Sequence, residues 1–260
     1  MKFLTLLLSV LVTLSACNAK PQQPSSANLP PAASSETTCT PEASSPAVIS
    51  YEIGDIILTD GSVVKTAELT ALNENSLPMA VIAGFRADGT AFGIGVHRSG
   101  GPLQWAPAGT MGNSIKFTET VCTDSVVGDT DGSDNWAMIC SADPQGITDT
   151  AANYPAFHFV NTYAEAYQLP ENYASGWYMP SIAEVCTVYD NRAAVNASLQ
   201  TIYGLDSDAA MDGLGTVWYW ASSQADSDDD YVWFEHYFNG YSATCPKDFD
   251  NLHVMAVHAF

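Results

Sequence analysis

The sequence predicts an α+β domain that is preceded by an N-terminal export signal and a tether. Two β-prone runs, residues 79–85 and 91–96, flank an Asp88-Gly89 step, which is the pattern of a β-hairpin. Apolar residues take up helical spacing from about residue 155 to residue 203. Residues 216–260 return to strand-like sequence that is rich in aromatic and acidic side chains. Strands followed by helices and then strands again predict an α+β fold.

The N-terminus has the features of a bacterial lipoprotein signal. Lys2 precedes the apolar run 3–14, and Leu14-Ser15-Ala16-Cys17 follows it. We therefore expect a signal peptide over residues 1–16 and a lipid on Cys17. The run is too short to span a bilayer, so the N-terminal lipid would be the only membrane attachment. The alternative is a soluble secreted protein that is cut near Ala16 or Ala19.

Residues 17–47 form a second segment, composed mainly of Pro, Ser, Ala and Thr. Because this segment contains almost no large apolar residues, it is predicted to be a disordered tether. Residues 48–260 would then form a single domain displayed at the outer cell surface. The formal net charge of −21 argues against nucleic acid and anionic membranes as partners.

Cysteine usage leaves two readings open. An exported chain favours disulfides, and Cys122–Cys140 and Cys186–Cys245 are plausible pairs, with Cys39 left in the tether. Reduced, buried cysteines are the equal alternative. No CxxC motif or Cys/His ligand spacing occurs, so zinc is not expected.

The region 48–118 is predicted to be rich in β-structure. Strands are expected over 51–58 and 62–66 around the Asp60-Gly61 turn, before the hairpin described above. The run Leu103-Gln104-Trp105-Ala106-Pro107 is interpreted as an apolar anchor in a loop.

Residues 122–145 are predicted to be a loop that carries Asp129, Asp131 and Asp134. Acids at this spacing around Gly132 could bind calcium through their carboxylate oxygens. The further acid that an EF-hand loop needs near its end is missing, which favours an ordinary Asx-rich turn. No other cofactor is expected.

Three segments follow that loop. Residues 155–169 are predicted to form one amphipathic helix, and residues 193–203 another. Between them, a short strand over 176–180 leads into a helix that starts at a capping box formed by Ser181 and Glu184.

The sequence offers no case for catalysis. The five histidines are scattered, and neither H-E-x-x-H nor G-x-S-x-G occurs. Ser222 and Ser223 have no identifiable base. We therefore expect a protein that is not an enzyme.

Three motifs occur in order near the C-terminus. They are Gly176-Trp177-Tyr178-Met179-Pro180-Ser181-x-x-Glu184, Tyr219-Trp220-x-Ser222-Ser223, and Trp233 with Gly240, Lys247 and the closing run 254–260. Together they resemble the C-type-lectin-like fold, in its formylglycine-generating-enzyme-like subset. More specifically, they resemble the variable proteins of diversity-generating retroelements, of the treponemal surface-lipoprotein type. This resemblance covers residues 155–260, and the β-rich part upstream is similar to treponemal lipoprotein relatives.

The resemblance implies a single α+β domain whose region 216–260 presents a diversified ligand-binding face. We expect the protein to be a monomer. In that family, adenine-directed mutagenesis converts asparagine codons into codons for residues such as Tyr, Asp, Ser, Ala, Thr, His and Phe, and never Trp, Lys, Glu, Gln or Met. The residues that fit this set are Asp228, Asp229, Asp230, Tyr231, Phe234, His236, Phe238, Tyr241, Ala243, Thr244, Asp250 and His253.

Strand periodicity supports part of this set independently. If Trp233 is core, Phe234, His236 and Phe238 point outward, because successive side chains of a strand alternate. Glu235 would then lie on the core side, either paired or displaced by a slip of register. The alternative is a strand that is buried on both faces.

The partner implied by this composition is an extracellular protein, since exposed aromatic, acidic and small polar residues suit protein recognition. A glycan bound through calcium is the alternative, although the Glu-Pro-Asn and Trp-Asn-Asp motifs of such lectins are absent. A more remote alternative is an exported enzyme of formylglycine-generating type. That activity uses two C-terminal cysteines, whereas only Cys245 lies near the end of this chain.

Overall fold

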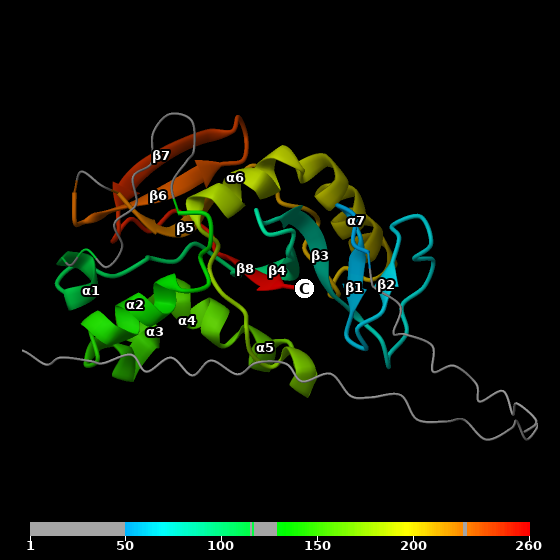
Figure 1. Cartoon of the computed structure of the whole chain (residues 1–260), viewed down its shortest axis with the longest axis horizontal. Helices are drawn as coiled ribbons and strands as arrows, with labels where there is room; N and C mark the ends of the chain where they lie inside the picture. Colours follow the sequence, from blue (N-terminus) through cyan, green and yellow to red (C-terminus); the bar gives the residue numbers. More distant parts are fainter. Residues whose placement is uncertain (1–49, 115, 117–128, 226–227) are drawn as a thin grey trace, which may run out of the picture. The chain divides into compact units, whose positions relative to one another are not determined.

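The computed structural model describes residues 50–260, apart from 115, 117–128 and 226–227. Within these residues, two antiparallel sheets lie among several helices (Figure 1), which confirms the α+β class. The signal peptide, Cys17, the tether with Cys39, and Cys122 lie outside the described residues.

The larger sheet has the strand order β2-β1-β3-β4-β8. Its strands are β1 (Ile56–Leu58), β2 (Val63–Val64), β3 (Pro78–Phe85), β4 (Ala91–Arg98) and β8 (Met255–Ala259). The predicted β3–β4 hairpin is confirmed. Its turn is held by the Asp88 carboxylate, which accepts from the Thr90 N–H at 2.8 Å, and Gly89 has φ +88°. That left-handed conformation favours glycine.

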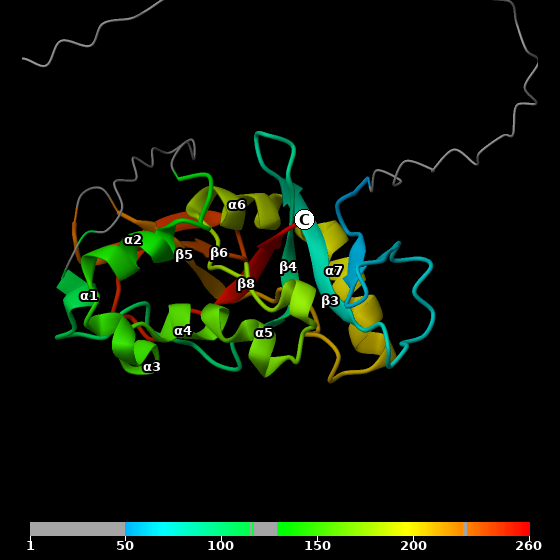
Figure 2. The ribbon, with the colours of Figure 1, turned by 60° about the horizontal axis from the view of Figure 1, so that its bottom comes forward.

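The end of the chain completes this sheet. Strand β8 pairs with β4, with Ile94 opposite Val257, and the Phe260 N–H donates to the Ala91 carbonyl at 2.8 Å. Figures 1 and 2 show β8 beside β4. The larger sheet is therefore built from the first and the last strands of the domain.

The smaller sheet has the order β5-β6-β7, with β5 (Trp218–Gln224), β6 (Tyr231–His236) and β7 (Tyr241–Pro246). The segment before β8 runs beside β5. There the His253 N–H donates to the Trp218 carbonyl at 2.8 Å, and the Trp220 N–H donates to the His253 carbonyl at 3.1 Å. This segment connects the two sheets.

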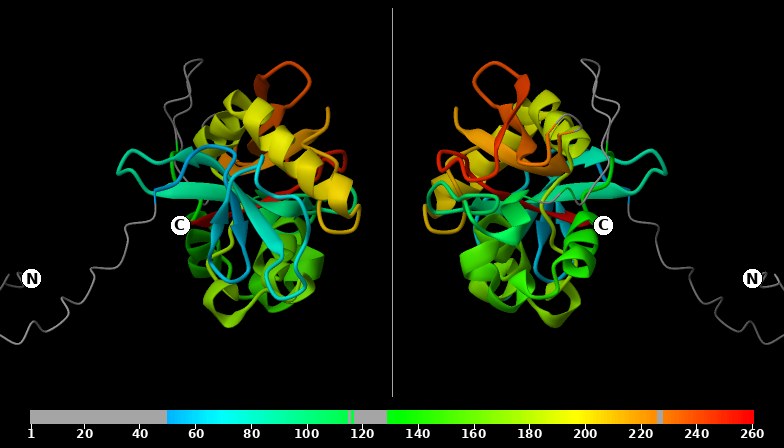
Figure 3. Two further views of the ribbon diagram at one scale, coloured as in Figure 1. Left: turned by 90° about the vertical axis from the view of Figure 1, so that its right-hand side faces the viewer. Right: turned by 90° about the vertical axis from the view of Figure 1, so that its left-hand side faces the viewer.

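Helices cover both faces of the larger sheet (Figures 1 and 3). One side carries the C-terminal pair α6 (Ile182–Asp190) and α7 (Arg192–Leu205). The other side carries α4 (Pro155–Asn161) and α5 (Tyr163–Ala166), and the same half of the molecule holds α2 (Asn135–Ala142), η1 (Gly146–Asp149) and α3 (Thr150–Asn153). The short elements α1 (Met111–Ser114) and η2 (Glu171–Tyr173) lie in connections. No helix in the described part of the chain is long and apolar enough to cross a membrane.

The predicted capping box is confirmed. The Ser181 hydroxyl accepts from the Glu184 N–H at 3.3 Å, and the Glu184 carboxylate accepts from the Ser181 N–H at 2.9 Å. Both residues are buried, so the start of α6 is fixed inside the molecule. The helix predicted over 193–203 is also confirmed, as α7.

Two predictions about the other helices are wrong. The single helix over 155–169 is divided at Thr162, whose hydroxyl bonds the His158 carbonyl at 2.7 Å and competes with the helical ladder. The loop over 122–145 contains α2, which starts at Asn135. Its apolar residues Trp136 and Ile139 pack on the core beside Tyr154 and Phe157, so tertiary packing stabilises a segment with weak helical periodicity.

The core has two parts, one on each face of the larger sheet. Along β3, Ala80 and Ile82 join one cluster, while Val81 and Ala83 join the other, as strand alternation requires. Trp105 is fully buried, and its indole N–H donates to the Ala221 carbonyl at 3.2 Å. The predicted apolar anchor at 103–107 is confirmed.

The proposed disulfide between Cys186 and Cys245 is absent. Cys186 packs with one core cluster and Cys245 with the other, because α6 and the interior-facing side of β7 lie on opposite faces of the smaller sheet. Cys140 is a thiol, and its proposed partner Cys122 lies outside the described residues.

Candidate functional site

Strand β6 presents two different faces. Trp233 and Tyr237 pack with the core cluster under α6, and the Tyr237 hydroxyl donates to the Val185 carbonyl of α6 at 2.8 Å. Phe234 and His236 lie on the opposite side, together with Trp218 of β5. The predicted alternation about Trp233 is therefore confirmed.

Glu235 lies on the α6 side, without a slip of register. It is fully buried, and its carboxylate accepts hydrogen bonds from the Ser242 hydroxyl and, at 3.7 Å, from the Cys186 thiol. Burial raises the pKa of Glu235 above its ordinary value, against the lowering effect of the Ser242 hydrogen bond. The carboxylate is thus a partnered structural group.

The opposite side carries a continuous set of rings, which we call the aromatic face. Trp218 is its centre: its ring lies 5.2 Å from Phe234 and 6.2 Å from Phe249 in stacked pairs, and 5.2 Å from His236 edge to face. The members of the aromatic face are Trp218, Phe234, His236, Phe238, Tyr241 and Phe249.

The prediction that Phe234 points into solvent is wrong. Only 6% of its surface is exposed, because Trp218 stacks on the ring and the side chain joins a core cluster. The alternative of a strand buried on both faces holds at this position, while at His236 the same face opens to solvent.

The two most exposed rings flank the β6–β7 turn. Phe238 is 70% exposed and Tyr241 is 61% exposed. Gly240 has φ +68°, and a Cβ there would overlap the Tyr189 ring, so the turn requires glycine. The neighbouring Tyr237 is buried. The exposed rings therefore stand on a turn that is fixed to α6.

A shallow groove of about 210 Å³ adjoins this surface. It is lined by Thr216, Val217, Trp218, Asn251 and His253. The His253 ring nitrogen Nδ1 lies 3.2 Å from the Ser99 carbonyl, and burial lowers the pKa of His253, so the imidazole is neutral at pH 7. Asp250 is exposed beside Asn251 in the chain.

The predicted variable residues do not form one patch. Ala243 lies opposite Phe234 and shares the aromatic face, whereas Thr244 lies opposite Trp233 on the α6 side. Tyr231 pairs with Pro246 at the far end of β6 from the Phe238 turn. The exposed acidic turn formed by Asp228, Asp229 and Asp230 precedes Tyr231 at that far end. The structure therefore groups His236, Phe238, Tyr241 and Ala243 around Trp218 and separates the acids from them.

A buried cation lies behind the acidic turn. The Lys247 N–H donates to the Asp230 carbonyl at 2.9 Å, and the Lys247 ammonium donates to the Gly112 carbonyl at 3.0 Å while lying 5.2 Å from the Trp105 ring centre. Burial lowers the pKa of Lys247 to about 8, and the carboxylates of Asp228–Asp230 oppose this effect. Lys247 therefore lies under the acidic turn and connects it to the backbone at Gly112.

Two of the three proposed calcium ligands, Asp129 and Asp131, are engaged with protein groups, while Asp134 is the N-cap residue of α2, where burial raises its pKa. Asp129 accepts from Asn135 and from the Ser223 hydroxyl, at 2.5 and 2.9 Å. Asp131 pairs with Arg86 at 2.6 Å, and it also accepts from the Ser133 N–H. Among the described residues, no group of three or more acidic, histidine or cysteine side chains is arranged to hold a metal ion. The Asp131 N–H donates to the Asp129 carboxylate and the Ser133 N–H donates to the Asp131 carboxylate, which are the hydrogen bonds of an Asx-rich turn.

Cys245, Ser222 and Ser223 lack the surroundings of an activated nucleophile. Burial raises the pKa of Cys245 to about 12, so its thiol is protonated at neutral pH and is a poor nucleophile. The Ser222 hydroxyl donates to the Pro180 carbonyl, and the Ser223 hydroxyl donates to Asp129. These groups hold the loops around α6 together.

Comparison with known proteins gives a likeness of fold alone. The sequence matches no protein-family model and no curated protein. Its structure is similar to the crystal structure of a fimbrial protein from Bacteroides ovatus, with a TM-score of 0.52 and 13% sequence identity. The likeness covers 80% of this chain and 48% of the other, so the chain spans about half the length of that protein.

Sequence reasoning missed Trp218, Phe249 and Asn251. Trp218 does not belong to the set of residues that mutagenesis of asparagine codons can produce. Its position two residues before Trp220 was the available signal, since both then share one face of β5. Phe249 lies in a loop, where periodicity carries no information about facing.

Proposed function

We propose that the protein is a surface-displayed lipoprotein that binds an extracellular macromolecule, foremost a protein, through the aromatic face. The observation that carries this proposal is the pair Phe238 and Tyr241, which are largely exposed on a turn that buried neighbours hold in place. A turn whose backbone is already fixed loses little conformational entropy on binding, and exposed aromatic rings contribute large contact areas.

The surroundings of these rings support recognition of a protein. Trp218, His236 and Phe249 extend the apolar area, and the groove beside Trp218 offers Asn251 for hydrogen bonding. Interface centres are enriched in aromatic residues and surrounded by polar groups. The acidic turn lies further along the sheet and would favour a partner with a basic rim.

The finer proposal is a C-type-lectin-like variable protein whose face is diversified. In its support, four residues that fit the asparagine-codon set, His236, Phe238, Tyr241 and Ala243, lie on the aromatic face or its turn, while Trp233 and Gly240 are scaffold. Buried Phe234 fits this scheme less well, because a change there would alter the core.

The test is the double variant Phe238→Ser/Tyr241→Ser in binding to a panel of purified secreted and cell-surface proteins, with a glycan array with and without calcium run in parallel. We expect the unmodified domain to retain at least one protein, and the double variant to bind that protein at least tenfold more weakly. Its melting temperature should stay close to that of the unmodified domain, because both side chains are exposed.

The matched control is Phe85→Ser/Tyr203→Ser, which removes one exposed Phe and one exposed Tyr away from the face, 44% and 41% exposed. This variant should bind as the unmodified domain does. Equal binding by the Phe238→Ser/Tyr241→Ser variant, or retention of glycans alone, would contradict the proposal.

The likeness to a fimbrial protein supports a second candidate, a subunit of a surface fibre. Such a subunit would associate with copies of itself or with other subunits at micromolar concentration. Sedimentation of the purified domain separates the two candidates: a monomer that still captures a ligand supports the binding protein, and a concentration-dependent ladder of oligomers supports the fibre.

A further inference from the structure

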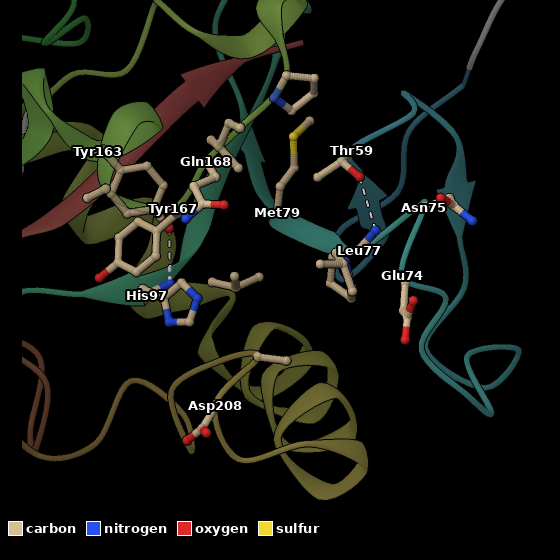
Figure 4. Close-up of a pocket in the computed structure, with 16 residues that line it drawn as sticks. Thr59, Glu74, Asn75, Leu77, Met79, His97, Tyr163, Tyr167, Gln168 and Asp208 are labelled. Carbon is tan, nitrogen blue, oxygen red and sulfur yellow. Dashed lines mark hydrogen bonds between the residues drawn. The ribbon is translucent and has the colours of Figure 1, made fainter.

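A second hollow lies away from the aromatic face. It is found where the loop before β3, the end of β4 and the residues in and after α5 meet. Its volume is about 510 Å³, within the range of small-molecule sites. It is bounded by the loop before β3, by Val96 and His97 at the end of β4, by residues 163–170, and by the loop at Asp208 (Figure 4). None of the proposed face residues lines it.

One wall of the hollow is a built aromatic stack. The His97 imidazole lies 4.1 Å from the Tyr167 ring with planes inclined by 10°, and Tyr167 lies 4.7 Å from Tyr163. The Tyr163 hydroxyl accepts from the backbone N–H of His97 at 3.1 Å, and a Cβ on Gly95 would overlap that hydroxyl. Glycine at position 95 therefore leaves the space that the Tyr163 ring of the stack occupies.

Next to this wall the backbone is strained. Gln168 has φ +53°, the left-handed region that few residues other than glycine adopt. The neighbouring N–H groups hold it there, since Gln168 bonds the Glu165 carbonyl at 3.2 Å and Leu169 bonds the Ala164 carbonyl at 2.8 Å. Such conformations cluster at ligand sites, and this one turns residues 168–170 along the hollow.

The charge of the lining has one sign. Glu74 and Asp208 are exposed carboxylates on different sides of the hollow (Figure 4), and neither takes part in an ion pair of the described residues. Among the residues that the structure describes, no lysine or arginine lines it. Burial lowers the pKa of His97, which leaves the imidazole neutral at pH 7. The site therefore repels anions and attracts cations.

Part of the lining is apolar, and we call this part the floor. It consists of Leu77, Met79, Val96, Leu169 and Pro170. A ligand that matches this lining has an aliphatic stem for the apolar floor and a positive charge that the aromatic stack attracts. It also has ammonium groups that can pair with the carboxylates of Glu74 and Asp208. An ammonium ion beside an aromatic ring is attracted by the negative potential of the ring face. A neutral sugar would use the stack but would leave the two charges without partners.

We propose that this hollow is a binding site for a linear aliphatic diammonium compound, with its stem on the apolar floor, its charges toward Glu74 and Asp208, and the His97–Tyr167 stack beside it. This site is independent of the aromatic face. The protein would then carry a small-molecule site in addition to its macromolecular one.

The experiment is calorimetric titration of the purified domain with 1,5-diaminopentane, in parallel with the neutral 1,5-pentanediol and with N-acetylglucosamine. We expect binding of the diamine that weakens with added salt, and no heat with the diol or the sugar. The variant Glu74→Gln/Asp208→Asn should bind the diamine at least tenfold more weakly, and Tyr167→Leu should also weaken it.

The matched control is Glu68→Gln/Asp190→Asn, which removes two exposed carboxylates outside the hollow and should bind the diamine normally. All four acids are exposed, so both double variants are expected to fold. The proposal is overturned if the diamine gives no saturable heat, if the two double variants weaken binding equally, or if the diol or the sugar binds as tightly as the diamine.

Discussion

The indole of Trp218 stacks on the ring of Phe234 across the β5–β6 pair, with centroids 5.2 Å apart and planes inclined by 17°. Trp218 keeps part of its surface in solvent, whereas Phe234 is buried. The pair therefore joins the aromatic face to the core, and the buried ring fixes the position of the partly exposed one.

Replacing Phe234 should separate core from surface within this face. Phe234→Ala leaves a cavity under Trp218 and should lower the free energy of unfolding by about 3 kcal/mol. Phe238→Ala, two residues further on, should change it by less than about 0.5 kcal/mol. Urea denaturation measures both, and equal losses would show that Phe238 is core as well.

Glu235→Gln should change how stability depends on pH. The folded-state pKa of Glu235 is raised by burial, so above pH 4.5 the folded state binds more protons than the unfolded state until the raised pKa is passed. The free energy of unfolding therefore falls as pH rises through that window, and the glutamine variant lacks this fall. The difference in free energy of unfolding between the Glu235→Gln variant and the unmodified domain should therefore shift in favour of the variant from pH 4.5 upward. The exposed control Glu68→Gln should show no such growth.

Lys247→Met should act in the alkaline range. The pKa of Lys247 is lowered from 10.5 to about 8, so between these values the unfolded state binds the extra proton, and stability from this group rises with pH. Below pH 8 the burial penalty is fully present, and it amounts to up to roughly 3 kcal/mol. Methionine keeps the packing on Trp105 and removes this dependence. The difference in unfolding free energy between variant and unmodified domain, measured at pH 7 and pH 10, should therefore become less favourable to the variant at pH 10; a constant difference would contradict the assignment.

Cys17→Ser tests membrane attachment. We expect the unmodified protein to incorporate labelled fatty acid and to sediment with membranes, and the variant to lose both properties. If the protein is instead a soluble secreted one, the unmodified chain and the variant will both be found in the soluble fraction, without label.

The diversification proposal predicts a pattern in the DNA. A near-copy of the 3′ end of the gene, differing only at adenines, should lie beside it with a reverse transcriptase. Sibling sequences should vary at Phe238 and Tyr241 and keep Trp233 and Gly240. Siblings that keep Phe238 and Tyr241 would indicate a fixed binding surface.

Local signals predicted the parts of the fold that local chemistry determines. The Asp88-Gly89 turn, the Ser181–Glu184 capping box and α7 all depend on residues close together in the sequence, and the structure confirms them. The alternation about Trp233 was likewise predictable, because it needs only the period of a strand.

The failures come from contacts between distant residues. Phe234 is buried because Trp218 of another strand covers it, and α2 forms because Tyr154 and Phe157 pack against it. The Cys186–Cys245 pairing failed because spacing along the chain says nothing about which face of a sheet each thiol occupies. The hollow beside His97 is lined by residues from five separate segments of the chain, so no single sequence motif could predict it.

The pairing of β8 with β4 has a consequence for synthesis. Any product that stops before Met255 lacks the strand that closes the larger sheet and leaves the edge of β4 without its partner. Such an edge invites aggregation and proteolysis. A frameshift or stop codon anywhere in residues 216–254 therefore also removes β8, so the larger sheet cannot be completed in such a chain.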